Sequence, residues 1–310
     1  MREVRELKKD VEQMKVIIIG GIAAGMSAAA KFKRLSPNDE VVVYEKGDIV
    51  SFGACGLPYY VGGFFDNPDN MIARTPQEFK ESGVIIHTKH EVTDVDFKNK
   101  KLKITNVNTG EQLEDKYDKL MIATGAKAII PPIKNVNLKN VETLKSLDDG
   151  NKLRDLMNDE SLKKVTVIGA GFIGLEAVEA AKHKGKEVTV IQLQDRILQE
   201  VFDKEITDVL EDEIRDENVE LLLGETVTEL IGDDKVTKVK TDKREIDTDI
   251  VIIATGVRPN TDFLHSEDIK MWKNGAIVVD KFGRTSVEDV YSAGDCATIN
   301  SLITEKHMYV

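Results

Sequence analysis

Two glycine-rich turns, each directly after a run of β-branched residues, constrain the fold of this chain most. VIII (16–19) runs into GGIAAG (20–25), and VTVI (165–168) runs into GAGFIG (169–174). Helix-favouring sequence follows each turn, to about Leu35 and about Lys184, and a second apolar strand comes next. Such β-α-β units bring glycine backbone and a helix N-terminus against the pyrophosphate of a dinucleotide.

The first unit carries an acid where a ribose ligand is expected. Its second strand, VVVY (41–44), is followed by Glu45, which lies 20 residues past Gly25. A carboxylate at this place accepts hydrogen bonds from the ribose hydroxyls of an ADP moiety. The middle glycine of the G-x-G-x-x-G pattern is replaced by Ile22, so this turn alone would be a weak signal.

The second unit has a complete glycine pattern but no acid at the end of its second strand. Gln192 occupies that place, and Arg196 is the nearest arginine. The choice between NADH and NADPH therefore stays open. LMIATGA (120–126) and VIIATGV (251–257) add a second repeat, because each reads as a buried strand that ends in Ala-Thr-Gly. The repeats predict an internal duplication and two bound dinucleotides.

Composition excludes several other classes of protein. A chain of 310 residues suggests two domains, and a net charge of −12 argues against a nucleic-acid surface. No apolar run approaches a membrane span. Two cysteines give no disulfide framework and fit a reducing cytoplasm, and five scattered histidines predict no metal site. Residues 1–13 read as a polar extension that the fold does not need.

The pattern between the repeats predicts further elements. Helices are expected at 76–82, with Thr75 as N-cap, at 148–158 and at 203–216. The segments 84–105 and 219–240 alternate as antiparallel strands and hairpins do. The predicted fold class is α/β, with two Rossmann-like dinucleotide-binding domains, each with a central parallel sheet and an antiparallel β-meander.

Taken together, residues 14–310 resemble the pyridine nucleotide–disulfide oxidoreductase flavoproteins. Within that family the likeness is to coenzyme A disulfide reductase and its relatives, which include NAD(P)H oxidases and polysulfide reductases. GRTS (283–286) and DVYSAGDCA (289–297) match the family's C-terminal flavin motif. The resemblance implies an FAD-binding domain at 14–125 and 257–310, with an NAD(P)H-binding domain at 126–256 inserted. It also implies that the family's C-terminal dimerisation domain is absent.

The resemblance also assigns site residues. FAD contacts are expected from Gly20, Ala23, Ala24, Gly25, Glu45, Lys46, Val92, Ala123, Thr124, Gly125, Gly294 and Asp295. NAD(P)H contacts are expected from Gly169, Gly171, Phe172, Ile173, Gly174, Glu176, Gln192 and Gly256. Substrate contacts are expected from Ser27, Lys31, Arg34 and Ser51. Lys31 and Arg34 could meet the phosphates of coenzyme A, or they could be ordinary solvated residues of a helix.

One cysteine is the expected catalytic residue. Cys55 in SFGAC (51–55) matches the family's S-F-x-x-C, in which a single cysteine is the redox centre. LPYY (57–60) follows directly and predicts a helix whose N-terminus favours thiolate over thiol. The oxidised form of a lone cysteine must be a mixed disulfide or a sulfenic acid. Cys296, in contrast, reads as a small buried residue.

These features lead to an expected activity. Hydride would pass from NAD(P)H through FAD to Cys55, which would reduce a small-molecule disulfide, most of all coenzyme A disulfide. No histidine stands between Gly20 and Ser27, whereas the oxidase and peroxidase branches carry one there. Polysulfide, sulfur or oxygen as acceptor, and a truncated binding module without turnover, remain alternatives. Full-length relatives are homodimers, and the oligomeric state of this chain stays open.

Overall fold

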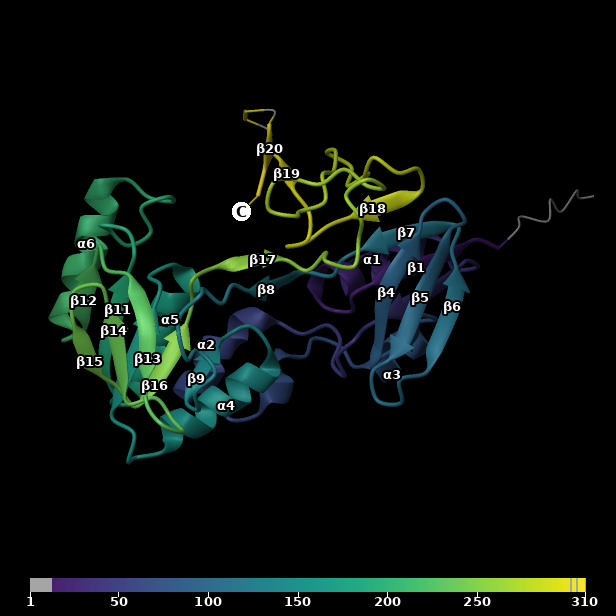
Figure 1. Cartoon of the computed structure of the whole chain (residues 1–310). Helices are drawn as coiled ribbons and strands as arrows, with labels where there is room; N and C mark the ends of the chain where they lie inside the picture. Colours follow the sequence, from purple (N-terminus) through teal and green to yellow (C-terminus); the bar gives the residue numbers. More distant parts are fainter. Residues whose placement is uncertain (1–12, 302, 305, 310) are drawn as a thin grey trace, which may run out of the picture. The chain divides into compact units, whose positions relative to one another are not determined.

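The computed structural model describes residues 13–301, 303–304 and 306–309, arranged in two compact units (Figure 1). The first unit takes the chain up to Phe52, then 72–125, then Pro259 onward. The second unit takes 53–71 and 126–258. The segment 53–71 thus groups with the second unit, although the sequence assigned it to the first domain. The polar extension expected at 1–13 falls, apart from residue 13, outside the described residues.

The central sheet of the first unit is fully parallel, with strand order β18-β7-β1-β2-β3. Its strands are β1 (Lys15–Ile19), β2 (Glu40–Tyr44), β3 (Ile85–His87), β7 (Lys119–Ile122) and β18 (Val290–Ser292). Ile17 pairs with Val42 on one side and Leu120 on the other. These central strands are buried on both faces, which explains their continuous β-branched sequence.

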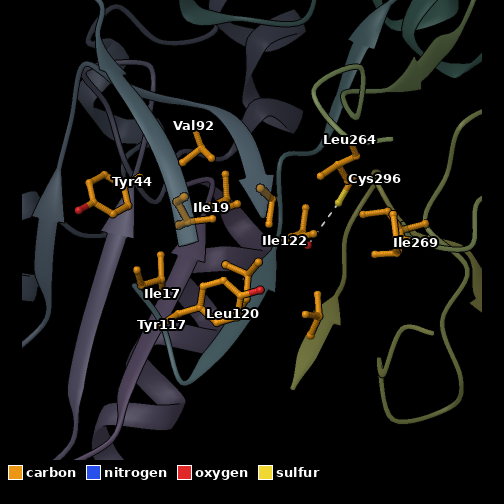
Figure 2. Close-up of a cluster of buried hydrophobic side chains, with 14 of the residues drawn as sticks. Ile17, Ile19, Tyr44, Val92, Tyr117, Leu120, Ile122, Leu264, Ile269 and Cys296 are labelled. Carbon is orange, nitrogen blue, oxygen red and sulfur yellow. Dashed lines mark hydrogen bonds between the residues drawn. The ribbon is translucent and has the colours of Figure 1, made fainter. Parts of the chain in front are cut away.

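Two helices, an antiparallel meander and a small hairpin complete the first unit. They are α1 (Ala23–Leu35), α3 (Pro76–Glu81), the strands β4 (His90–Asp96), β5 (Lys101–Asn106) and β6 (Gln112–Lys116), and the pair β19 (Ile299–Asn300) and β20 (His307–Met308). Thr75 caps α3 in a reciprocal capping box with Glu78, as its sequence predicts. A core cluster joins the meander and the sheet, and includes Tyr44, Tyr117 and Cys296 (Figure 2).

The second unit repeats the parallel sheet with strand order β12-β11-β10-β16-β9. Its strands are β9 (Val141–Thr143), β10 (Lys164–Ile168), β11 (Glu187–Gln192), β12 (Glu220–Leu223) and β16 (Ile250–Ile253). Its longer helices are α4 (Leu147–Asn158), α5 (Phe172–His183) and α6 (Lys204–Asp216). The antiparallel strands are β13 (Val227–Ile231), β14 (Lys238–Thr241) and β15 (Glu245–Asp247), and a short ribbon pairs β8 (Ala126–Ala128) with β17 (Val257–Pro259).

The segment 53–71 packs on helices of the second unit. It forms a 3₁₀ turn, η1 (Ala54–Gly56), then α2 (Leu57–Gly62), and a second 3₁₀ turn, η2 (Pro68–Met71). Helix α2 lies against α4 and α5. A Cβ at Gly150 of α4 would lie only 2.6 Å from Leu57 Cδ2. Glycine in the middle of α4 therefore allows this close approach, at the cost of helix propensity.

The expected fold class is confirmed, with one correction to the strand pairing. β3 and β12 lie within segments that alternate like antiparallel hairpins, but each pairs in parallel, β3 with β2 and β12 with β11. These short edge strands have few residues from which to distinguish the two kinds of pairing. In the described part of the chain, no helix is long and apolar enough to cross a membrane.

Candidate functional site

The first glycine turn lies against the end of β7. Gly20 has φ +100°, and a Cβ there would lie 2.2 Å from Ala123 O. A Cβ at Gly25 would lie 1.9 Å from Gly20 O. Both positions therefore require glycine, one for its conformation and contact and the other for contact alone. The C-terminal ends of parallel strands meet at this edge of the sheet, where open α/β sheets bind their ligands.

Glu45 closes this turn from the end of β2. Its carboxylate is buried and accepts hydrogen bonds from Gly21 N–H and Gly47 N–H, both at 2.7 Å. A carboxylate has about four lone-pair sites. The two backbone bonds therefore fix the carboxylate and leave acceptor capacity for the hydroxyls of a ribose.

Other groups at the same edge also suit a bound dinucleotide. Thr124 Oγ1 is buried and has no hydrogen-bond partner among the described residues. A buried hydroxyl of this kind usually finds a partner in the protein, in water or in a ligand. Gly125 and Gly294 both have positive φ, and a Cβ at Gly294 would lie 3.1 Å from Ala24 Cβ. The C-terminal flavin motif thus reaches the first glycine turn, which fits the FAD that the sequence predicts.

The other residues predicted to bind FAD differ in whether their side chains are exposed or buried. Ala23 opens α1, Lys46 is exposed next to Glu45, and Asp295 is exposed next to Gly294. Val92, by contrast, has its side chain in the core cluster (Figure 2), so only its backbone could contact a ligand. A register shift in β4 between Val92 and Asp94 interrupts the ladder there.

Three of the four predicted substrate positions share one face of α1. Ser27, Lys31 and Arg34 follow each other at helical spacing and are all exposed. Ser51 has φ +55°, donates its N–H to Gly21 O at 2.8 Å and accepts from Ala73 N–H at 2.9 Å. The structure thus presents two cations and a hydroxyl on one helix face of the first unit.

The second unit holds a cavity of about 580 Å³ at the corresponding edge of its sheet. Its lining includes the predicted residues Gly169, Gly171, Phe172, Ile173, Gln192 and Gly256. A Cβ at Gly174 would lie 2.0 Å from Gly169 O, whereas a Cβ at Gly171 would meet nothing within 4 Å. Gly174 therefore serves close packing, and Gly171 leaves backbone open for a ligand, as a pyrophosphate site requires.

Gln192 and Glu176 differ in their relation to this cavity. Gln192 lines it, and its Oε1 accepts a hydrogen bond from Ala170 N–H at 2.8 Å. Glu176 lies on α5, one turn beyond Phe172, and does not line the cavity. Burial, and then the neighbouring Glu179, raise the pKa of the Glu176 carboxyl above its usual range.

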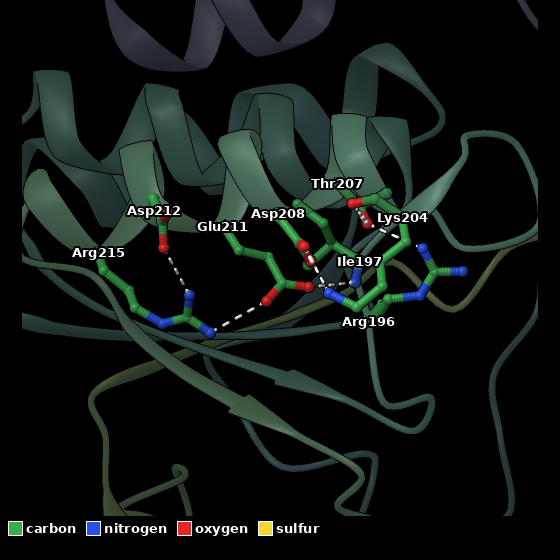
Figure 3. A network of polar contacts seen from close by, with 8 residues as sticks. All are labelled: Arg196, Ile197, Lys204, Thr207, Asp208, Glu211, Asp212 and Arg215. Atoms are coloured by element: carbon green, nitrogen blue, oxygen red, sulfur yellow. Dashed lines mark hydrogen bonds and ion pairs between the residues drawn. The ribbon is translucent and has the colours of Figure 1, made fainter.

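Sequence reasoning missed the segment that forms the far wall of the cavity. The segment that connects β11 to α6 lines the cavity with four residues, Leu198, Gln199, Glu200 and Val201. The buried carboxylate of Glu211 on α6 accepts from Ile197 N–H at 3.2 Å and from Arg215 at 3.1 Å (Figure 3). Arg196 donates to Thr207 Oγ1 at 3.0 Å. Helix α6 thus holds this wall in place. The sequence does not predict these contacts, because Glu211 reads as part of a solvent-exposed acidic run.

Cys55 lies in η1, directly before α2, and is exposed. Met71 supports this turn from the other end of the segment, because its carbonyl accepts from Gly53 N–H at 2.8 Å. A Cβ at Gly56 would lie 2.8 Å from Met71 Cγ. The thiol is therefore accessible on a turn that is packed from one side.

Arg154 of α4 holds the end of α2 and was not predicted from the sequence. Its guanidinium donates to the carbonyls of Tyr60 and Phe65 and to the carboxylate of Asp66, and it stacks 4.5 Å above the Tyr60 ring. A cation at the C-terminus of a helix also complements the helix dipole. An arginine in a charged helix pattern gives no sequence signal for such a role.

The second cysteine is enclosed. Cys296 is fully buried, and its Sγ lies 3.4 Å from Ile122 O (Figure 2) and 3.4 Å from Ser292 Oγ. This agrees with its interpretation as a small core residue. Within the described ranges, no group of three His, Cys, Asp or Glu side chains could hold a metal ion.

Comparison with known proteins points to one family. The family model described as pyridine nucleotide-disulphide oxidoreductase matches residues 14–308. An NADH oxidase of Enterococcus faecalis is 38% identical over 299 residues, which is 96% of this chain and 66% of the relative. An NAD(P)H coenzyme A polysulfide/persulfide reductase of Pyrococcus horikoshii is 38% identical over 297 residues, with 96% and 65% covered.

Solved structures give the same result. The water-forming NADH oxidase from Lactobacillus brevis bound to NADH superimposes with a TM-score of 0.92 at 34% identity, over 96% of this chain and 66% of that one. Reduced CoADR-RHD from Bacillus anthracis gives 0.91 at 30% identity, over 96% and 54%. The chain spans about two thirds of the length of the curated relatives it matches.

Proposed function

The chain belongs to the pyridine nucleotide-disulphide oxidoreductase family, and on that basis we propose that it carries electrons from NAD(P)H through FAD to Cys55, which reduces a small-molecule disulfide. The observation that carries the proposal is a single exposed cysteine in a chain with two dinucleotide-binding units. Coenzyme A disulfide is the proposed substrate. A relative named for coenzyme A polysulfide/persulfide reduction supports this substrate class.

The residues of the chain have separate tasks in this proposal. Gly171 and the turn around it admit the pyrophosphate of NAD(P)H, while Gln192 faces its ribose. Glu45 and Asp295 would hold hydroxyls of FAD, and Gly20 lets the turn lie against the end of β7. When bound, FAD would accept a hydride and pass on the two electrons that cleave a disulfide at Cys55.

The thiol step balances without a further oxidant or reductant. The Cys55 thiolate attacks one sulfur of the disulfide, so a mixed disulfide forms and one thiol leaves. Two electrons and a proton then cleave the mixed disulfide, releasing the second thiol and restoring Cys55. Overall, one NAD(P)H and one proton convert one disulfide to two thiols. Lys31 and Arg34 are proposed to bind phosphates of the substrate.

Substitution of Cys55 tests the proposal. Cys55→Ser should keep both cofactors and flavin bleaching by NAD(P)H, but should lose disulfide reduction. Incubation of the oxidised wild type with coenzyme A disulfide should add one coenzyme A per chain, measured by intact mass and released by reductant. Cys296→Ala is the control, because its buried sulfur should not take part. An adduct on Cys296, or disulfide reduction by Cys55→Ser, would contradict the assignment.

Oxygen is the second candidate acceptor, because relatives in Enterococcus faecalis and Lactobacillus brevis are named NADH oxidases. The absence of histidine from the first glycine turn disfavours it. An oxygen electrode separates the two. Oxygen consumption at the rate of NADH oxidation, unaffected by added disulfide, would favour the oxidase.

A further inference from the structure

The internal duplication extends to one hydrogen bond, whose acceptor side chain is charged in one unit and neutral in the other. In the first unit, Glu45 at the end of β2 accepts from Gly21 N–H at 2.7 Å. In the second unit, Gln192 at the end of β11 accepts from Ala170 N–H at 2.8 Å. Both donors are the second residue of their glycine turn. The same contact is thus made by a carboxylate in one unit and by a neutral amide in the other.

The orientation of the Gln192 amide is fixed by its partners. Ala170 N–H can only donate, so Gln192 must present its oxygen to the turn. Its amide nitrogen then donates to Gln194 Oε1 at 2.6 Å. Gln194 must therefore accept with its own oxygen, which leaves its amide nitrogen as a donor. Both side chains line the cavity, so this edge presents amide donors without a negative charge.

Of the charged residues near this edge, Lys145, Glu200 and Glu225 line the cavity, whereas Asp195 and Arg196 do not. Arg196 donates to Thr207 on α6 (Figure 3), and Asp195 Oδ1 lies beside Gly224; neither side chain lines the cavity. Two acids do line it. Glu225 is buried, paired with Arg244 at 2.9 Å and bonded to Thr241 at 2.8 Å, so its charge is neutralised. Glu200 is exposed to solvent on the opposite wall.

We propose that the nucleotide cavity of the second unit does not discriminate against a phosphate on the ribose 2′ oxygen, and that Gln192 is the residue responsible. A carboxylate at a strand end binds the ribose diol and repels a 2′-phosphate, whereas a dedicated arginine selects for that phosphate. Amide donors at this edge can donate hydrogen bonds to a ribose hydroxyl oxygen or to a phosphate oxygen. The cavity therefore accepts NADH and NADPH. This inference rests on the proposed function, because it assumes that the cavity binds a nicotinamide dinucleotide.

The test uses ligands that carry the ribose but no hydride. ADP-ribose and 2′-phospho-ADP-ribose are titrated calorimetrically into the purified full chain, so flavin reduction cannot interfere. The two Kd values of the wild type should agree within about tenfold, whereas Gln192→Glu should raise the Kd of the phosphorylated ligand at least about tenfold relative to the other. Gln199→Glu is the matched control, with the same substitution elsewhere in the lining, and should change the ratio far less. Arg196→Met should leave the ratio unchanged.

Each contrary result has a distinct meaning. A wild-type preference above about a hundredfold for either ligand, a ratio that Gln192→Glu does not alter, or an equal effect of Gln199→Glu overturns the inference while the proposed function stands. A large loss of 2′-phospho-ADP-ribose binding in Arg196→Met assigns discrimination to Arg196 and also overturns it. If neither ligand binds at millimolar concentration, both the inference and the proposed function fail.

Discussion

Removal of one hydroxyl group from the core of the first unit is expected to stabilise the protein. Tyr117 is 4% exposed, and its hydroxyl is buried with no hydrogen-bond partner in the described part of the chain (Figure 2). An unsatisfied buried hydroxyl costs about 1–3 kcal/mol in protein mutational data. Tyr117→Phe removes that group and keeps the ring. The free energy of unfolding should therefore rise by about 1 kcal/mol or more.

A second tyrosine in the same core cluster provides the matched control. The Tyr44 hydroxyl donates to Asp115 Oδ2 at 2.8 Å, while Lys15 Nζ lies 2.7 Å from the other carboxylate oxygen. Tyr44→Phe removes a hydrogen bond to a charged group, which is worth about 1.5–3 kcal/mol. The same substitution should thus lower the free energy of unfolding here, because Asp115 stays half-buried with one partner fewer.

Alkaline pH provides a second readout. Burial raises the pKa of Tyr117 from its ordinary value to about 12. Between pH 10 and 12 the unfolded chain therefore loses this proton while the folded chain keeps it, so stability falls as pH rises. Two pKa units correspond to about 2.7 kcal/mol at most. Tyr117→Phe should remove this contribution, and its advantage over the wild type should grow with pH in that window.

The assay follows urea unfolding by the fluorescence of Trp272, which is the one tryptophan of the chain and belongs to the first unit. Wild type, Tyr117→Phe and Tyr44→Phe are compared at pH 8 and pH 11 with flavin content matched. Equal destabilisation by both substitutions at pH 8 would refute the reasoning, because the two hydroxyls would then be equally well satisfied.

Two further predictions concern the sites. Arg154→Met should accelerate amide exchange at 57–66 about tenfold or more, because α2 loses charged hydrogen bonds worth about 2–3 kcal/mol. Lys152→Met, on an exposed part of the same helix, should leave that exchange unchanged. Unaltered exchange at 57–66 in Arg154→Met would show that these contacts do not hold the segment. Glu45→Ala and Asp295→Ala should each weaken FAD retention by about 1.5–3 kcal/mol, measured as flavin loss on dialysis. Normal flavin occupancy in the double variant would contradict the placement of FAD.

The sequence predicts most of the framework because its strongest signals are local. A β-branched run followed by glycines and a helical pattern predicts β1, β10 and their turns, since each strand is buried on both faces. Thr75 and Pro76 likewise predict the start of α3. The partners of short edge strands depend on tertiary contacts, and therefore β3 and β12 were assigned the wrong pairing.

The candidate site shows the same division between local and distant information. Glu45 and Gly171 are found from spacing alone. Glu211 accepts from a backbone N–H and Arg154 donates to backbone carbonyls, in each case on another segment of the chain. Such contacts leave no pattern in the sequence. The assignment of 53–71 to the second unit also depends on distant contacts. The sequence of this segment does not indicate which helices it will pack against.

The placement of 53–71 has a consequence for synthesis of the protein. The chain leaves the first unit after Phe52 and re-enters it at Ile72, and these two residues form an isolated bridge. Helix α2 packs on α4 and α5, its buried residues Leu57 and Tyr60 face Gly150 of α4, and α5 ends only at His183. At translation rates of about 5–20 residues per second, the ribosome needs on the order of ten seconds to supply these helices. During that interval the apolar face of α2 lacks the helices that cover it in the folded protein. We therefore expect the nascent chain to be most prone to aggregation, and to modification of the Cys55 thiol, before the second unit has formed.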